Sequence, residues 1–179
     1  MSEKRIPFDE LTNSDLIVGT IYESDPTRHS YGAEPLSNMF PSTGNNGGFR
    51  YRRGANGEVV SLLLTSSGIE SEWPDTYDEK NGVFTYFGDN RKPGVGLLET
   101  SRKGNQVLKT IFEQAHGARA DRAKCPLTLV FQSTREARNM KFIGLAVPGA
   151  EFAGPGEDLV AFWSSKDGSA FQNYRALFT

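Results

Sequence analysis

Cysteine and histidine are the scarcest reactive residues in this chain of 179 residues, which holds one Cys and two His. Cys125 alone cannot form an internal disulfide, and together with His29 and His116 it does not give the ligand spacing of a zinc site. A Ser–His–Asp triad would have to use one of these two histidines. His116 is better explained as the end of a predicted helix, where the helix dipole favours a positive charge. These absences argue against a hydrolase or a zinc protein, and we expect no cofactor, no metal and no catalytic residue.

Long apolar runs are also missing. No stretch approaches the roughly 18 apolar residues that a membrane-spanning helix requires, and residues 1–7 lack the apolar core of a signal peptide. Hydrophobic residues make up 37% of the chain and charged residues 23%, which is ordinary for a globular protein. We therefore expect one domain over residues 1–179, with no membrane partner, that works in the cytoplasm.

Motifs for nucleotide or metal chemistry are weak. Gly94-Val95-Gly96 is not followed by the Gly-Lys-Ser/Thr of a phosphate-binding loop. Pro74-Asp75 with Asp78-Glu79-Lys80 resembles the acids and lysine of metal-dependent nucleases, in which two carboxylates hold a divalent metal. Those two acids come from different strands, and a single short loop cannot reach across adjacent strands. A small metal-dependent nuclease therefore stays only as an alternative.

Positive charge is concentrated in one part of the chain. Residues 91–141 contain eleven Lys and Arg against four acids, a balance of +7, so the rest of the chain carries −9. Charge separated in this way favours a polyanionic ligand such as nucleic acid on one face of the protein.

The apolar pattern predicts many short strands and one clear helix. Alternating or β-branched runs predict strands over 16–22, 59–65, 83–87, 127–131, 140–147, 159–163 and 171–178. The apolar spacing over 105–116 is that of one helical face. Turns are expected at Asn56-Gly57 and at 166–169. This order of elements predicts an α+β fold built on a curved sheet or barrel.

The middle of the chain resembles the SRA (SET- and RING-associated) domain. The resemblance is carried by Asn56-Gly57, Val60-Ser61-Leu62-Leu63-Leu64, Phe84-Thr85-Tyr86-Phe87-Gly88-Asp89-Asn90-Arg91 and Thr100-Ser101-Arg102-Lys103-Gly104-Asn105. Within that group it is most similar to the N-terminal recognition domains of modification-dependent restriction endonucleases of the AspBHI and MspJI type. The resemblance implies an SRA-like (PUA-like) curved β-sheet or barrel with few helices. It also implies that this chain binds DNA, while a fused or partner nuclease cleaves it, in a bacterial cytoplasm at the nucleoid.

Such domains read 5-methylcytosine in double-stranded DNA by rotating it out of the duplex, so a pocket must restore stacking and hydrogen bonds. Aromatic faces can restore stacking, and a carboxylate can accept from the cytosine N4 amino group. The resemblance assigns the pocket to Trp73, Asp75, Tyr86, Asp89 and Asn90, with Asp78 as the alternative acid. We prefer Asp75, because Trp73-Pro74 would anchor its part of the loop.

Basic residues near this stretch are candidates for contacts with DNA phosphates, which position a protein without specifying sequence. These candidates are Arg50, Arg52, Arg53, Arg102 and Lys103. The polar loop over 40–48 could enter a groove, where Asn45 and Asn46 could hydrogen-bond bases. Because related barrels share a fold without sharing a ligand, 5-hydroxymethylcytosine, phosphorothioate DNA and modified RNA stay open as ligands.

Overall fold

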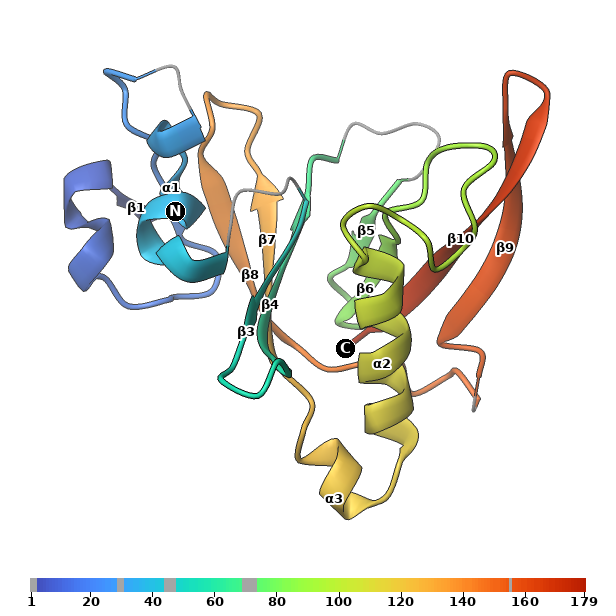
Figure 1. Cartoon of the computed structure of the whole chain (residues 1–179). Helices are drawn as coiled ribbons and strands as arrows, with labels where there is room; N and C mark the ends of the chain where they lie inside the picture. Colours follow the sequence, from blue (N-terminus) through green and yellow to red (C-terminus); the bar gives the residue numbers. More distant parts are fainter. Residues whose placement is uncertain (1–2, 29–30, 44–47, 69–73, 155) are drawn as a thin grey trace. The chain divides into compact units, whose positions relative to one another are not determined.

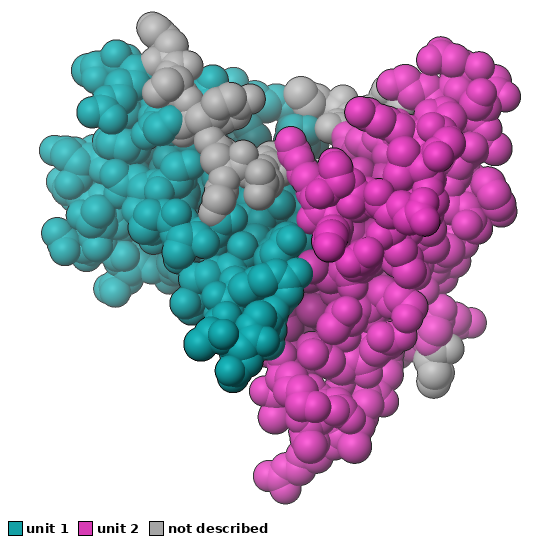
Figure 2. Space-filling model, viewed as in Figure 1, with its two compact units in different colours: residues 1–68, 127–146 teal, residues 69–126, 147–179 magenta. Residues whose placement is uncertain are grey.

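The computed structural model describes residues 3–28, 31–43, 48–68, 74–154 and 156–179. Its elements are β1 (Arg5–Ile6), η1 (Phe8–Asn13), β2 (Ile21–Tyr22), η2 (Tyr31–Ala33), α1 (Pro35–Met39), η3 (Pro41–Thr43), β3 (Phe49–Arg53), β4 (Val59–Ser66), β5 (Thr76–Asp78), β6 (Val83–Phe87), α2 (Gly104–His116), α3 (Arg119–Arg122), β7 (Leu127–Ser133), β8 (Met140–Ala146), β9 (Leu159–Lys166) and β10 (Ser169–Phe178) (Figure 1). They fall into two compact units, residues 1–68 with 127–146 and residues 69–126 with 147–179 (Figure 2). The predicted α+β class with few helices is confirmed, and the prediction of a single domain stays a prediction.

The first unit is built on a six-stranded sheet in the order β1-β2-β8-β7-β4-β3. The strand β4, which lies between β7 and the end strand β3, contains Leu62, Leu63 and Leu64. All three side chains are fully buried, so this strand is covered on both faces. β4 pairs with β7 in parallel, and a parallel pair requires a long connection. That connection supplies residues 69–126 of the second unit.

The second unit is a four-stranded sheet in the order β5-β6-β10-β9, with every pair antiparallel. The helix α2 buries Val107, Leu108, Ile111 and Phe112, which recur at the helical period. The ring of Phe112 lies edge-on to Phe178 of β10, with 5.2 Å between the ring centroids. The sheet and α2 therefore form one packed body that holds β6 and the loops on either side of it.

Several sequence expectations are confirmed and others are corrected. The helix over 105–116 and the strand over 83–87 are found as α2 and β6. The strand over 16–22 is wrong except for its last two residues, because the chain turns at Gly19, where φ is 81°. β5 lies between Asp75 and Glu79, inside the short stretch that was expected to be a loop. Of the two forms expected, a curved sheet or a barrel, the described residues form open sheets, with β1 and β3 as the end strands of one and β5 and β9 as those of the other.

Candidate nucleic-acid interface

Asp75 lies immediately before β5 and is partly buried against β6. Its Oδ1 accepts a hydrogen bond from the backbone N–H of Phe87 at 2.9 Å, and the other oxygen, Oδ2, accepts none from the described residues. Burial raises the pKa of Asp75 from 3.8 to about 7, and the hydrogen bond from Phe87 offsets this only in part. One oxygen thus fixes this carboxyl group in position, and the other can accept a hydrogen bond from a ligand.

Tyr86 follows on the same strand, and its side chain is only 5% exposed. Its ring packs against Phe84 with 5.9 Å between the centroids. Burial raises the pKa of the phenol well above 10, and the charges of Asp75 and Asp89 raise it further. The structure therefore brings Asp75 and Tyr86 together, with Tyr86 as a neutral, buried wall. Trp73, the second aromatic candidate, lies outside the described residues, as do Asn45 and Asn46.

Asp78, the alternative acid, is exposed and holds the turn between β5 and β6. Its Oδ1 accepts from the backbone N–H groups of Lys80 and Asn81 at 3.1 and 3.2 Å, and its Oδ2 accepts from Asn81 Nδ2 at 2.6 Å. The bonds from Asn81 lower the pKa of Asp78. A carboxylate used in this way is part of a tight turn, and the geometry favours Asp75 as the acid that is open to a ligand.

Asp89 and Asn90 do not have the predicted pocket arrangement. Asp89 accepts from the backbone N–H groups of Gly104 and Asn105, both at 2.9 Å, so its carboxylate caps the start of α2. Asn90 is 1% exposed and donates to the carbonyl oxygens of Val95 and Gln172 at 3.0 and 2.8 Å. Because these groups are already bonded to the protein, we reassign both residues from the pocket to the loop between β6 and α2.

Two buried asparagines that were not among the predicted site residues complete this polar network. Asn105 donates through Nδ2 to Leu97 O at 2.8 Å and to Asn173 Oδ1 at 3.1 Å. Asn173 in turn donates to Gly88 O at 3.0 Å. A Cβ atom on Gly88 would lie only 1.8 Å from Asn105 Oδ1, so the network requires glycine there. The Gly88 and Gly104-Asn105 positions of the family resemblance were a signal for this network, but Asn173 had none.

Arg50 does not support its predicted role as a phosphate contact. Its side chain is 3% exposed, and its Nη2 lies 2.5 Å from Oε1 of Glu34, which is 8% exposed. A buried ion pair loses several kcal/mol when one partner is removed, so Arg50 is part of the core of the first unit. Burial is not visible in the alternating aromatic and basic residues of β3, and this assignment is corrected.

The other four predicted phosphate contacts are exposed. Arg53 lies over the ring of Tyr51, 5.2 Å from its centroid, and Arg52 precedes it at a break in the β3–β4 register. Arg102 and Lys103 stand at the start of α2, where Lys103 has a φ of 56°. Arg52 and Arg53 belong to the first unit, and Arg102 and Lys103 to the second.

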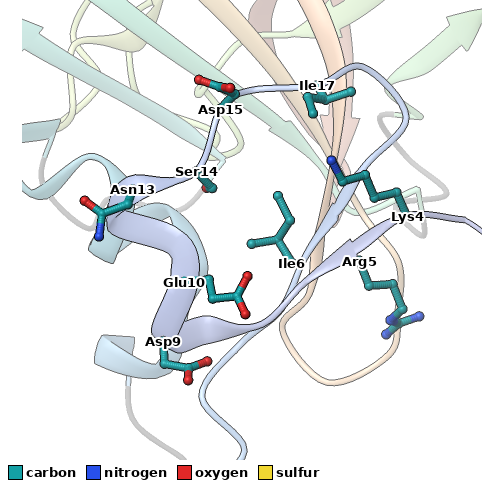
Figure 3. A pocket seen from close by; sticks show the side chains of 9 residues that line it. All are labelled: Lys4, Arg5, Ile6, Asp9, Glu10, Asn13, Ser14, Asp15 and Ile17. Atoms are coloured by element: carbon teal, nitrogen blue, oxygen red, sulfur yellow. The ribbon is translucent and has the colours of Figure 1, made fainter.

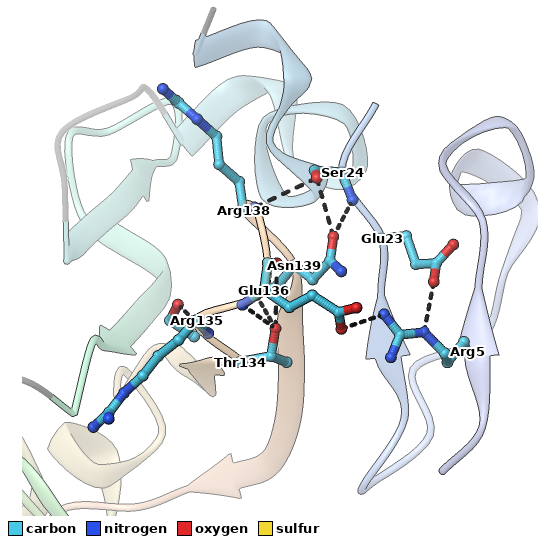
Figure 4. Close-up of polar contacts among 9 residues, drawn as sticks. Arg5, Glu23, Ser24, Thr134, Arg135, Glu136, Arg138 and Asn139 are labelled. Carbon is cyan, nitrogen blue, oxygen red and sulfur yellow. Dashed lines mark hydrogen bonds and ion pairs between the residues drawn. The ribbon is translucent and has the colours of Figure 1, made fainter. Parts of the chain in front are cut away.

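Part of the positive stretch over 91–141 is neutralised locally. Short ion pairs join Lys109 to Glu113, Lys124 to Asp121 and Lys141 to Glu3. The loop over 134–139, between β7 and β8, is held by polar contacts (Figure 4). In this loop Arg135 has a φ of 63° and donates through Nη2 to Gly68 O at 2.5 Å. The charge count alone therefore overstated the number of cations available to a ligand.

Neither a metal-binding group nor the cavity of the first unit involves the predicted site residues that the structure describes. The described residues contain no group of three or more His, Cys, Asp or Glu that could hold a metal ion. The carboxylate of Asp75 accepts a hydrogen bond from the backbone of β6, and that of Asp78 accepts hydrogen bonds in the turn after β5. A cavity of about 440 Å³ in the first unit (Figure 3) is lined by Lys4, Arg5, Ile6, Asp9, Glu10, Asn13, Ser14, Asp15 and Ile17. None of the predicted site residues lines it, and its three acids do not suit a phosphate backbone.

Of the helices in the described part of the chain, none has the length and apolar character needed to span a membrane.

Comparison with known proteins finds solved structures that share this fold and a protein family whose model matches the chain. No curated protein sequence matches the chain. The DNA recognition domain of the cytosine modification-dependent restriction endonuclease LpnPI is 34% identical, with a TM-score of 0.91 over 100% of this chain and 79% of that chain. The DNA modification-dependent restriction endonuclease AspBHI is 43% identical, with a TM-score of 0.89 over 98% of this chain and 44% of that one.

A more distant structure confirms the SRA-like fold. The SUVH5 SRA domain, solved in a complex with fully methylated CG DNA, is 15% identical, with a TM-score of 0.50 and 90% of both chains covered. A family described as restriction endonuclease AspBHI N-terminal matches residues 16–179. The chain therefore belongs to this AspBHI N-terminal family and is homologous to the DNA recognition domains of modification-dependent restriction endonucleases.

Proposed function

We propose that this chain binds double-stranded DNA containing 5-methylcytosine and reads the modified base after rotating it out of the duplex. The observation that carries the proposal is the arrangement of Asp75, whose Oδ1 is fixed to the backbone of Phe87 while Oδ2 accepts no hydrogen bond from the described residues. Tyr86 lies close enough for the charge of Asp75 to act on its phenol. The N4 amino group of cytosine is a donor that thymine lacks, so an acceptor held in place can distinguish the two bases.

The relatives support modified cytosine as the ligand. LpnPI is named as cytosine modification-dependent and AspBHI as DNA modification-dependent, and both share at least a third of their aligned residues with this chain. The match covers 44% of the AspBHI chain, and the matched LpnPI chain is named a DNA recognition domain. We therefore propose that these residues recognise DNA and that a fused or partner nuclease cleaves it. This role belongs in the bacterial cytoplasm, at the nucleoid.

The energetics of flipping set what the site must provide. Unstacking a base costs a few kcal/mol, which stacking and hydrogen bonds in the pocket must restore. Tyr86 is buried, so in this proposal it forms a wall of the pocket. Stacking on the flipped base is left to Trp73, the other aromatic residue that the resemblance assigns to the pocket. Arg52, Arg53, Arg102 and Lys103 would contact phosphates, which makes the affinity fall with salt because counterions are released.

A binding competition tests this function. Duplexes of one sequence carrying unmodified cytosine, 5-methylcytosine, 5-hydroxymethylcytosine or phosphorothioate linkages, together with a modified RNA, compete against a labelled methylated duplex. The methyl group alone contributes about 1 kcal/mol, so we expect at least about fivefold tighter binding to the methylated duplex than to the unmodified one. Equal affinity at moderate salt would contradict the proposal. 2-Aminopurine placed next to the methylated cytosine should brighten on binding, because flipping unstacks its neighbour.

A further inference from the structure

The β9–β10 hairpin continues past the strand that anchors it. β6 pairs with β10 only over residues 175–178, whereas β9 pairs with β10 from 169 to 176. In Figure 1 the far end of this hairpin stands clear of the other elements of its unit. The hairpin therefore ends as a two-stranded ribbon, and the major groove of B-DNA admits a ribbon of this width.

The ribbon is anchored at its base and closed by a tight turn at its tip. At its base, Asn90 Nδ2 donates to Gln172 O at 2.8 Å and the N–H of Gly88 donates to Tyr174 O at 2.9 Å, in place of a neighbouring strand. At its tip, Asp167 and Gly168 have φ values of 51° and 76°, as in a two-residue hairpin turn with both residues left-handed. A ribbon fixed in this way can present side chains without a large cost in ordering on binding.

Trp163 is the large side chain that the ribbon exposes. It lies on β9 opposite Gln172 of β10, and 68% of its surface is accessible. The residues that follow it are small or charged, namely Ser164, Ser165 and Lys166. An aromatic anchor in a protein–protein interface is surrounded by contacts that exclude water, and no apolar ring of this kind surrounds Trp163 on its ribbon.

The charges around the ribbon favour a polyanion. Between 159 and 178 the chain carries Lys166 and Arg175 against Asp167. The loop that fixes the base of the ribbon, residues 88–103, carries four Lys and Arg against two acids. One of those acids, Asp89, is bonded to the backbone of α2. The surroundings of Trp163 therefore match a phosphate backbone better than an acidic or apolar partner.

We propose that the β9–β10 ribbon is a second DNA-contacting element, which enters the major groove and packs Trp163 against sugars and base edges. The inference rests on the proposed DNA binding, and it adds a contact outside the base pocket. Since this contact does not touch the modified base, it contributes equally to binding of methylated and unmodified DNA.

Substitution of Trp163 tests the proposal. Removing a buried aromatic contact should weaken binding about tenfold, so we expect Trp163→Ala to lose about tenfold in affinity for both duplexes. Trp163→Phe should lose less. Phe152→Ala is the matched control, because Phe152 is 70% exposed in the same unit but lies outside the ribbon, and its affinity should not change. Fluorescence gives an independent readout, since Trp73 and Trp163 are the two tryptophans. Part of the change in tryptophan emission on DNA binding should disappear in Trp163→Phe.

The outcomes separate this proposal from the function on which it rests. Unchanged affinity of Trp163→Ala for both duplexes would overturn the ribbon contact and leave the base-reading function standing. A loss confined to methylated DNA would also overturn it, because Trp163 would then belong to base recognition. A change in oligomeric state without a change in DNA affinity would assign the ribbon to a second copy of the chain. If the unaltered protein shows no preference for methylation, the proposed function fails, while an equal loss on both duplexes would still support the ribbon.

Discussion

Two aspartates, Asp75 and Asp89, lie near the end of β6 at Phe87 and differ in what their oxygens bind. Both oxygens of Asp89 accept backbone N–H groups at the start of α2, and its loop is fixed by buried asparagines. Asp75 has one oxygen bonded to Phe87, and the other accepts no hydrogen bond from the part of the chain that the structure describes. An acid inside a motif that carries the family resemblance, such as Asp89, can therefore have a purely structural role. The acid that keeps an oxygen without a hydrogen bond from the described residues, Asp75, is the candidate for binding a ligand.

The largest effect is expected in the loop that contains Asp89, where a substitution of Gly88 should lower the stability of the protein most. Gly88→Ala would force a Cβ atom into Asn105 Oδ1 and Asn173 Oδ1, at 1.8 and 2.6 Å. We expect a loss of about 3 kcal/mol in the free energy of unfolding, measured by urea titration. Gly96→Ala in the same loop is the control, because the three atoms nearest to its Cβ all belong to the flexible side chain of Glu99. Equal stability of the two variants would contradict a rigid network.

Removal of the cap tests the role of Asp89 directly. Asp89→Asn exchanges a charged acceptor for an amide with one acceptor, which should cost about 1–2 kcal/mol of unfolding free energy. Once folded, the variant should keep its preference for methylated DNA, because Asp89 serves the helix. Thermal unfolding together with binding to the methylated and plain duplexes checks both parts. A stable variant without the methyl preference would return Asp89 to the pocket.

The pH dependence of stability should distinguish Asp75 from Asp78, because their pKa values shift in opposite directions. The pKa of Asp75 rises to about 7, so between about pH 4 and 7 the folded state holds a proton that the unfolded state has lost. Stability from this group is therefore full below about pH 4 and falls as the pH rises to 7. For a partly buried group, allowing for screening, the change is on the order of 1–2 kcal/mol.

Asp78 has a lowered pKa, so its contribution is present above its unfolded pKa and is lost as the pH falls through the lower folded value. Urea titrations from pH 3 to 8 of Asp75→Asn, Asp78→Asn and the unaltered protein check this. Asp75→Asn should abolish the decrease between pH 4 and 7, whereas Asp78→Asn should leave it in place. The same pH profile for all three proteins would show that Asp75 is not desolvated.

The smallest effect is expected for the exposed cations. Arg102→Ala with Lys103→Ala should weaken binding to methylated and plain DNA by similar factors of a few-fold. The slope of log affinity against log salt should become shallower by about one or two charges. Affinities measured at several salt concentrations test this, with Lys124→Ala as a control, because Lys124 is paired with Asp121. A selective loss of methyl preference would place one of these cations in the pocket.

Local patterns predicted the elements whose formation is decided locally. β6 and α2 carry a strong apolar period and were found at the predicted residues. β1 and β5 have two and three residues, so their pairing depends on distant strands. The residues over 16–20 looked like a strand because several are β-branched or apolar, yet Val18 is 67% exposed beside the turn at Gly19.

The site was harder to predict than the fold. The family resemblance directed attention to Asp75 and Tyr86, which the structure brings together. It could not separate them from Asn90, because the partners of Asn90 include Gln172, 82 residues away. The prediction that Arg50 contacts phosphate failed for the same reason, because its buried ion pair is formed with Glu34, 16 residues earlier in the chain. Hydrogen-bond partners distant in sequence decide whether a polar residue is free to bind a ligand.

The central claim is tested most directly by the affinities of Asp75→Asn and Asp78→Asn for methylated and unmodified duplexes, with circular dichroism to confirm folding. Loss of the charge-assisted bond to cytosine N4 is worth about 1.5–3 kcal/mol, so Asp75→Asn should bind methylated DNA at least about tenfold more weakly. Its affinity for unmodified DNA should hardly change, because phosphate contacts remain, and Asp78→Asn should resemble the unaltered protein on both duplexes. If Asp75→Asn retains the full preference for methylated DNA, the account of Asp75 as the residue that reads the base is contradicted.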